Sequence, residues 1–191
     1  MKGPDPVRKI ILGMQVSLDG FVATVDGRLD WAFANFDDEF YAATLDQLRQ
    51  LDTVLLGRVN YEGQAAHWPR QTGPIAELMN DIQKIVFSSR HDTLKWTNAR
   101  LATASPADEI RRLKQTPGRH VGVSGGARFA QALSTLKLVD EYVLNIHPVA
   151  LGAGLPLFAG QTELALVSSQ ALKSGVVVNH YRPIAMGGVR S

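Results

Sequence analysis

Short apolar runs alternate with amphipathic segments along this chain, and this alternation most constrains the fold. Buried strands appear as short continuous apolar runs, whereas helices repeat apolar residues every three or four positions. The runs predict strands over residues 8–16, 53–56, 84–87, 100–103, 120–124 and 140–149. The amphipathic segments predict helices over residues 38–51, around Tyr61, and over 74–82, 106–116 and 127–136. Such β-α-β units predict a mainly parallel sheet with helices on both faces.

The end of the chain departs from this alternation. Residues 164–172 and 176–182 read as two strands joined by Lys173-Ser174-Gly175, which indicates an antiparallel hairpin. We therefore expect an α/β, three-layer fold formed by one domain over residues 8–183. Residues 1–7 and 184–191 are expected to be flexible tails, because they are polar, contain glycine or are interrupted by proline.

Composition excludes several classes of chemistry. The chain has no cysteine, so disulfides, thiolate metal ligands and a cysteine nucleophile are excluded, and its 5 histidines are far apart, so no metal is expected. The basic residues are scattered and the net charge is only +2, which argues against a nucleic-acid partner. No apolar run is long enough for a membrane span, and no signal peptide is recognisable. We expect a cytoplasmic protein.

Polar and glycine-containing segments follow four of the predicted strands. They are Ser17 to Gly20, Gly57-Arg58, Ser88 to Arg90, and Gly125-Gly126, which opens directly into a helix. Open α/β sheets bind ligands at the carboxyl ends of their strands. Two glycines let a phosphate approach the backbone, where the N-terminus of a helix offers free N–H groups. The arginines could pair with a further phosphate.

Five separated segments resemble the dihydrofolate reductase superfamily, in the branch similar to the reductase domain of riboflavin biosynthesis. They are SLDGFVA (17–23), LLGRVNYEG (55–63), KIVFSSR (84–90), VSGGARF (123–129) and VDEYVLNIHPVALGAGLPLF (139–158). The resemblance implies a dihydrofolate reductase-like fold and hydride transfer from NADPH to a small pterin- or pyrimidine-like heterocycle. It also implies a homodimer.

The resemblance further implies which residues bind the cofactor. The implied residues are Ser17, Gly20, Leu56, Gly57, Arg58, Ser88, Ser89, Arg90, Gly125, Gly126, Ala127 and Arg128. Arg58 and Arg90 would favour NADPH over NADH, since only NADPH brings a 2′-phosphate to pair with them.

The resemblance gives candidates for the remaining site residues. Folate enzymes carry an acid on the helix after the first loop, a few residues past a tryptophan; here Asp37 follows Trp31 and is the first catalytic candidate. Asp19 is the second. Each has a structural alternative, because acids cap helices and hold turns. The candidate substrate-binding residues are Trp31, Tyr61, Trp68 and His147, for which packing in the core is the alternative.

Two other functions remain open. Residues 122–126 match G-x-S-x-G, so Ser124 could be the nucleophile of a serine hydrolase, with Asp140 and either His147 or His180 downstream. The second alternative is a nucleotide-binding module that keeps the cofactor site and has lost turnover.

Overall fold

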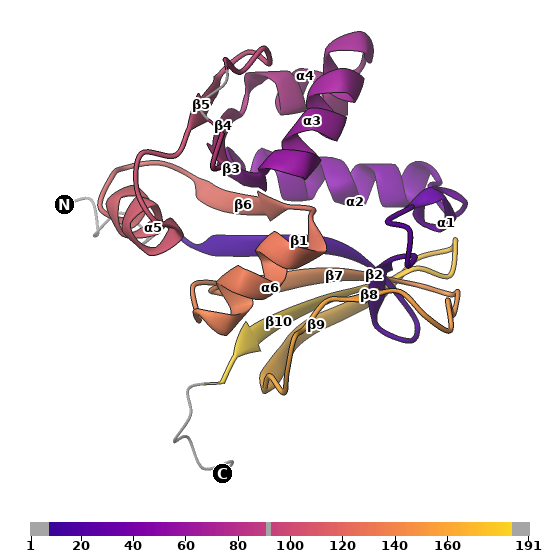
Figure 1. Ribbon diagram of the computed structural model, residues 1–191. Helices are drawn as coiled ribbons and strands as arrows, with labels where there is room; N and C mark the ends of the chain where they lie inside the picture. The colour runs from indigo at the N-terminus through magenta and orange to yellow at the C-terminus, as the bar shows by residue number, and fades with distance from the viewer. Residues whose placement is uncertain (1–7, 91–92, 185–191) are drawn as a thin grey trace, which may run out of the picture.

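The computed structural model describes residues 8–90 and 93–184, and within these ranges eight strands form one sheet (Figure 1). Their order across the sheet is β5 (Ala99–Leu101), β4 (Gln83–Phe87), β3 (Leu51–Gly57), β6 (His120–Ser124), β1 (Ile10–Ser17), β7 (Glu141–His147), β10 (Val177–Pro183) and β9 (Leu164–Ala171). The first six are parallel, and β10 runs antiparallel to both β7 and β9. The predicted mainly parallel sheet with a C-terminal antiparallel hairpin is confirmed.

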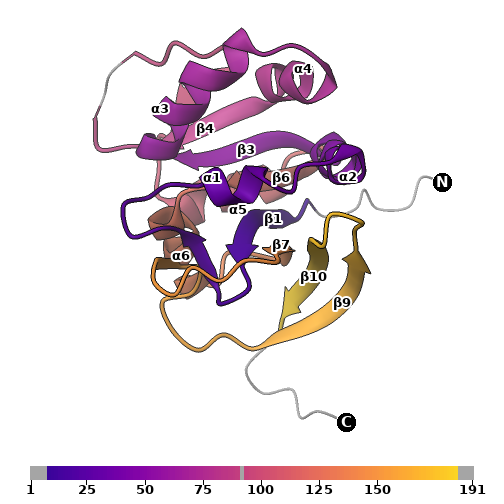
Figure 2. The same cartoon turned by 90° about the vertical axis from the view of Figure 1, so that its right-hand side faces the viewer.

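Helices cover both faces of this sheet (Figure 2). One face carries α2 (Asp38–Arg49), α3 (Arg58–His67), the short 3-10 helix η1 (Trp68–Arg70) and α4 (Pro74–Asp81). The other face carries α5 (Pro106–Lys114) and α6 (Ala127–Thr135). Two apolar clusters show this division, since Ile75 and Met79 of α4 pack with Val54, whereas Ile110 and Leu133 belong to the cluster on the opposite face.

Along β1, buried residues alternate with partly buried ones, which shows how the two faces of the sheet differ. Side chains of successive strand residues point to opposite faces. Ile10, Leu12, Met14 and Val16 belong to the cluster beneath α5 and α6 and are buried. Ile11, Gly13 and Gln15 point the other way and are only partly buried. A glycine and a glutamine therefore lie in the middle of the sheet on the face that α2 covers.

Some of the shortest elements were not predicted. They are α1 (Asp30–Phe33) and a separate two-stranded antiparallel sheet of β2 (Phe21–Ala23) and β8 (Leu155–Pro156). A four-residue helix has no apolar period, and the small sheet joins segments distant in the chain. The expected tails lie outside the described residues, except Ile184, whose N–H donates to the Glu163 carbonyl at 3.1 Å. Within residues 8–90 and 93–184, every helix is too short or too polar to cross a membrane.

Candidate functional site

The carboxyl ends of neighbouring strands bring the predicted cofactor segments to one edge of the sheet. Across that edge the strands end in the order β4 at Phe87, β3 at Gly57, β6 at Ser124, β1 at Ser17 and β7 at His147. The segments after β4, β3, β6 and β1 therefore follow one another in space. They come from four separate parts of the sequence, and the strand order makes them neighbours.

Two helix N-termini lie side by side at this edge. Gly57 is the N-cap residue of α3 and Gly126 that of α6, and neither helix has a capping side chain among the described residues. The helices are close, because a Cβ on Gly57 would lie 3.3 Å from Phe129 Cβ of α6. Uncapped N–H groups and the helix dipoles make such a place favourable for an anion.

The turn before α6 depends on its two glycines. Gly125 has φ +62° and Gly126 φ +82°, a region that other residues rarely adopt. Asn60 of α3 donates from Nδ2 to the Ser124 carbonyl, and Gln64 Nε2 donates to Ser124 Oγ at 3.0 Å. Helix α3 therefore holds the start of the turn in place.

The charged and hydroxyl residues of this edge differ in how freely they could contact a ligand. Arg58 Nε pairs with Glu62 Oε1 at 2.7 Å, whereas Arg90 and Arg128 are exposed. Ser88 Oγ accepts from the Arg90 N–H at 2.9 Å and so closes the turn after β4. Of the predicted cofactor residues, Leu56 is fully buried in the core, which leaves only its main chain for such a contact.

Asp19 holds the loop after β1 against the loop after β7. Its carboxylate accepts from Ser17 Oγ at 2.6 Å, from the Leu151 N–H at 3.1 Å and from the Gly152 N–H at 2.7 Å. The Ser17 hydroxyl, together with these main-chain donors, lowers the pKa of Asp19 to about 2. An ionised carboxylate has no proton to donate at neutral pH, so this environment favours the turn-holding alternative for Asp19.

We expect Asp19→Asn to loosen the loop after β7 and leave the global fold intact. The amide keeps one oxygen acceptor but loses the negative charge that attracts the Leu151 and Gly152 N–H groups. Hydrogen exchange at these two amides should become faster, while that of the central strands stays unchanged. Because the pKa of Asp19 is about 2, the wild-type loop should remain protected as the pH falls through 4 and lose protection only near pH 2. Unchanged exchange in the variant would contradict this role.

Asp37 occupies a capping position. It is the N-cap residue of α2, and its Oδ1 accepts from the Phe40 N–H at 2.8 Å. One of its two carboxylate oxygens is therefore used to cap the helix, as the structural alternative predicts. Its position at the start of α2 still places it beside the aromatic group around His147, since Phe40 packs against that ring at 5.7 Å between centroids. A catalytic role for Asp37 stays a prediction.

His147 is fully buried at the end of β7 and organises the residues around it. Its Nε2 lies 2.8 Å from Gln15 Oε1 on β1, and its ring meets the Trp31 ring edge-on at 5.4 Å. Burial lowers the pKa of His147, so the ring is neutral at physiological pH. Among the described residues, His147 Nδ1 and Trp31 Nε1 are both buried without a hydrogen-bond partner. The structure brings these two predicted residues together.

The other two predicted substrate residues lie in the apolar core beneath α3 and α4. Tyr61 is 4% exposed, and its hydroxyl accepts from the N–H groups of Lys95 and Trp96, both at 3.0 Å. Trp68 packs against the same cluster, and its ring meets the His67 ring edge-on. These surroundings favour packing in the core over substrate binding for both residues. The hydroxyl of Tyr61, in particular, is already used to hold the chain before β5.

A cavity of about 170 Å³ lies between α2 and the sheet. Gln15, Ser124 and Asn145 line it from the strands, and Thr44 lines it from α2. Because Ser124 directly precedes the glycine turn, the cavity reaches the edge where the two helix N-termini meet. Asn145 Oδ1 and Thr44 Oγ1 are buried without hydrogen-bond partners among the described residues. The cavity thus presents neutral polar groups that a ligand could satisfy.

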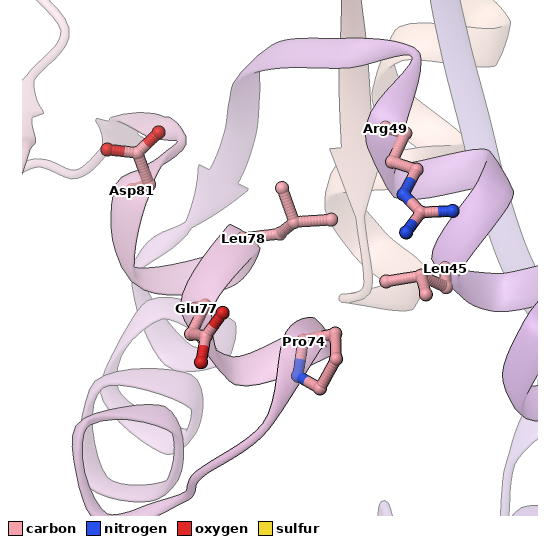
Figure 3. Close-up of a pocket in the computed structure, with 6 residues that line it drawn as sticks. All are labelled: Leu45, Arg49, Pro74, Glu77, Leu78 and Asp81. Atoms are coloured by element: carbon pink, nitrogen blue, oxygen red, sulfur yellow. The ribbon is translucent and has the colours of Figure 1, made fainter.

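A larger recess lies elsewhere, between α2 and α4 (Figure 3). Its volume is about 350 Å³, and Leu45, Arg49, Pro74, Glu77, Leu78 and Asp81 line it. Arg49 and Asp81 end helices that lead into the amino ends of β3 and β4, so the recess lies toward the opposite end of the strands from the glycine turn. Parallel α/β sheets bind ligands at the carboxyl ends, and the smaller cavity, which runs under α2 from Leu51 and Glu141 at the amino ends, reaches the carboxyl edge at Ser124. It is therefore the better candidate.

The structure contradicts the serine-hydrolase interpretation. Strand β1 separates β6, which carries Ser124, from β7, which carries His147, and each of these residues bonds to a glutamine instead. His180 on β10 is three strand spacings from β6, or roughly 14 Å. Asp140 precedes β7 at the opposite end of the sheet, where it pairs with Lys114. The described residues also contain no cluster of three or more side chains suited to a metal.

Sequence reasoning missed the polar residues inside strands. Gln15 on β1 and Asn145 on β7 were not singled out, although a glutamine and an asparagine interrupt otherwise apolar strands in GMQVS and YVLNIH. Gln64, on the helix α3, was missed as well. Such an interruption of a strand is the available signal, because a buried amide needs a partner. Periodicity alone does not show that Gln15 and Asn145 are paired neighbours on β1 and β7.

Comparisons with known proteins agree with this fold. The profile of a family described as the RibD C-terminal domain matches residues 8–178. The uncharacterized protein YyaP of Bacillus subtilis is 34% identical over 178 residues, which cover 89% of this chain and 92% of that protein. Two solved structures share the fold at low identity. A pyrimidine reductase-like protein from Corynebacterium diphtheriae has TM-score 0.67 and 14% identity, covering 93% and 92% of the two chains. Dihydrofolate reductase from Enterococcus faecalis, complexed with NADP(H), has TM-score 0.59 and 12% identity, covering 92% and 96%.

Proposed function

Because this chain belongs to the RibD C-terminal domain family, we propose that it is an NADPH-dependent reductase of a small pterin- or pyrimidine-like heterocycle. One observation carries the proposal: the polar cavity reaches Ser124, beside the two uncapped helix N-termini. Ser124 lines the cavity and is followed directly by the turn that opens α6. A dinucleotide on the edge would therefore reach toward a heterocycle in the cavity.

The residues at the edge fit a dinucleotide. Gly125 and Gly126 carry no side chains of their own where the two helix N-termini meet, and the Asn60 side chain packs against Gly125 from α3. A Cβ on Gly57 would lie 3.3 Å from Phe129 Cβ. We expect the N–H groups at Gly125, Gly126 and Ala127 to hold the diphosphate. Arg58, Arg90 and the serines after β4 would hold the 2′-phosphate. When bound, NADPH supplies the hydride, and the protein orients the two rings.

On the substrate side, the neutral side chains of Gln15, Thr44 and Asn145 would contact the reacting ring. Gln15 is held by the neutral His147 and lines the cavity. Trp31 closes the same region against His147. We keep Asp37 as the candidate acid that orients the substrate or delivers a proton, because it begins the helix whose Thr44 lines the cavity. The names of the pyrimidine reductase-like and dihydrofolate reductase structures support a pyrimidine or pterin ring.

A thermal-shift comparison of NADPH with NADH tests the cofactor. A ligand at 100 times its Kd stabilises the folded state by about 2.7 kcal/mol, which corresponds to roughly 5–11 °C in Tm for a chain of this size. We expect NADPH to give the larger shift. Arg58→Ala and Arg90→Ala should reduce the NADPH shift more than the NADH shift, because each would lose a charged hydrogen bond to the 2′-phosphate, worth about 1.5–3 kcal/mol.

Arg49→Ala is the matched control. Arg49 is an exposed arginine that pairs with Asp46 at the opposite end of the strands, so its loss should leave both shifts unchanged. Equal shifts for NADPH and NADH in every variant would refute the phosphate-pairing role. Binding of NADPH with no oxidation across a panel of pterins and pyrimidines would favour the alternative of a non-catalytic nucleotide-binding module.

The homodimer implied by the family resemblance also stays a prediction. Static light scattering at micromolar concentration should give twice the chain mass of 20.8 kDa. A mass equal to one chain at all accessible concentrations would contradict it.

A further inference from the structure

Asn145 places an amide group inside the cavity under α2. It lies in the middle of β7, is 3% exposed and lines the cavity beneath α2. Its Oδ1 has no hydrogen-bond partner among the described residues. Leaving a buried amide unpaired costs roughly 1–3 kcal/mol, so a strand centre would ordinarily carry an apolar residue there. The position is explained if the amide serves a ligand.

Gln15 places a second amide beside that of Asn145. Gln15 and Asn145 are direct cross-strand partners on β1 and β7, so their side chains project from the same face of the sheet. With Gln15 Oε1 facing His147 Nε2, the Nε2H₂ group of Gln15 remains as a donor. Thr44 Oγ1, also unpaired, adds a hydroxyl from α2 on the other side of the cavity. Together these groups supply both hydrogen-bond donors and acceptors to the cavity.

The charges around the cavity restrict what it can hold. Its only ionisable lining residues among those described are Glu141 and His180. Glu141 is already paired with Lys9 at 2.8 Å and with Arg182 at 2.9 Å. No lysine or arginine of the described chain lines the cavity. Phosphate groups are held in proteins by arginine, lysine or helix N-termini. Because the two helix N-termini at this edge would hold the dinucleotide, the described lining of the cavity keeps no group suited to a phosphate on the substrate.

The size of the cavity gives a further limit. Pockets for drug-sized ligands measure roughly 300–1,000 Å³. At about 170 Å³, this cavity suits one ring or two fused rings.

We infer that the substrate is an uncharged, unphosphorylated lactam heterocycle, whose adjacent N–H and C=O groups pair with the amides of Asn145 and Gln15. A lactam edge offers one donor beside one acceptor, which is the complement of a carboxamide. This inference rests on the proposed function for the identity of the site, and it names the class of ring that the site accepts.

Ligand-observed NMR titrations with and without NADPH test the inference. The probes are lumazine, uracil and uridine 5′-monophosphate, which share the lactam edge and differ in ring size and in the sugar phosphate. We expect lumazine and uracil to bind, and the monophosphate to bind at least about tenfold more weakly than uracil. Asn145→Leu should weaken lumazine binding by about tenfold or more, because the lost amide leaves the lactam unpaired.

The Tm of the variants separates a ligand-binding role from a structural one. Asn145→Leu should keep or raise the Tm of the free protein, since leucine of similar size replaces an unpaired amide. If leucine does not fit at this position, Asn145→Val gives the same comparison, because valine is favoured in strands. Asn179→Leu is the matched control: Asn179 also has an unpaired buried Oδ1, but it lies on β10 opposite Leu144, on the other face of the sheet. It should leave lumazine binding unchanged.

Three results would overturn the inference. They are tighter binding of the monophosphate than of uracil, no binding of lumazine or uracil to protein that binds NADPH, and unchanged lumazine affinity in both Asn145 variants. If lumazine binds through Asn145 but NADPH does not bind, the proposed reductase function fails and the inference about the ring stands.

Discussion

Gly125→Ala is expected to weaken NADPH binding by about 30- to 150-fold. Gly125 has φ +62°, and a Cβ there would lie 2.5 Å from Asn60 Nδ2, which bonds to the Ser124 carbonyl. The methyl group must displace that side chain and distort the turn that presents the N–H groups. Losing one charge-assisted contact to the diphosphate costs roughly 2–3 kcal/mol, which converts to the stated fold-change. Fluorescence titration of the folded variant measures the Kd.

Gly27→Ala is the matched control for Gly125. Gly27 also has a positive φ, +83°, but a Cβ there meets nothing within 4 Å, and it lies in the exposed turn after β2. Both variants should lose about 1–2 kcal/mol of stability from the left-handed backbone. Only Gly125→Ala should lose affinity. A normal Kd for NADPH in Gly125→Ala would remove the glycine turn as the diphosphate site.

Glu109→Gln is expected to destabilise the protein by about 2–3 kcal/mol at pH 7. Glu109 is 2% exposed and accepts from both terminal nitrogens of Arg100, at 3.1 and 2.9 Å, and from the Thr103 N–H at 2.8 Å. The Arg100 guanidinium, with the Thr103 donors, lowers the pKa of Glu109 to about 2, against 4.5 for the free side chain. At about 1.4 kcal/mol per pKa unit, with some screening at the half-exposed Arg100, this depression gives the stated magnitude.

The pH dependence of this effect has a definite sign. A carboxyl group with a depressed pKa in the folded state stabilises fully above its unfolded pKa of about 4.5 and ceases to stabilise as the pH falls toward 2. The difference in unfolding free energy between wild type and Glu109→Gln should therefore be constant from pH 7 to 5.5 and shrink toward zero near pH 2. Urea denaturation at several pH values measures it. The exposed Glu163→Gln should change little, and a constant difference down to pH 2.5 would contradict the prediction.

The segments predicted to bind the cofactor could be found from the sequence, whereas their assembly at one edge of the sheet was only implied. Gly57-Arg58 and Gly125-Gly126 each follow an apolar run and open a helix, and this local order carries the physical signal. These segments are neighbours because β3 lies beside β6, although 62 residues, including β4, β5 and four helices, lie between Gly57 and His120 along the chain. The roles of Asp19 and Tyr61 depend in the same way on bonds to segments that lie distant in the sequence.

The sequence alone determined the alternation of strands and helices, the C-terminal hairpin and the glycine turn, because each depends on residues within about ten positions of one another. Only the tertiary structure decided which polar residues share the cavity. Gln15 and Asn145 meet because β1 inserts between β6 and β7, and the α2 helix then covers them both. Strand order is set by the packing of whole faces, so no local pattern could have paired these two amides.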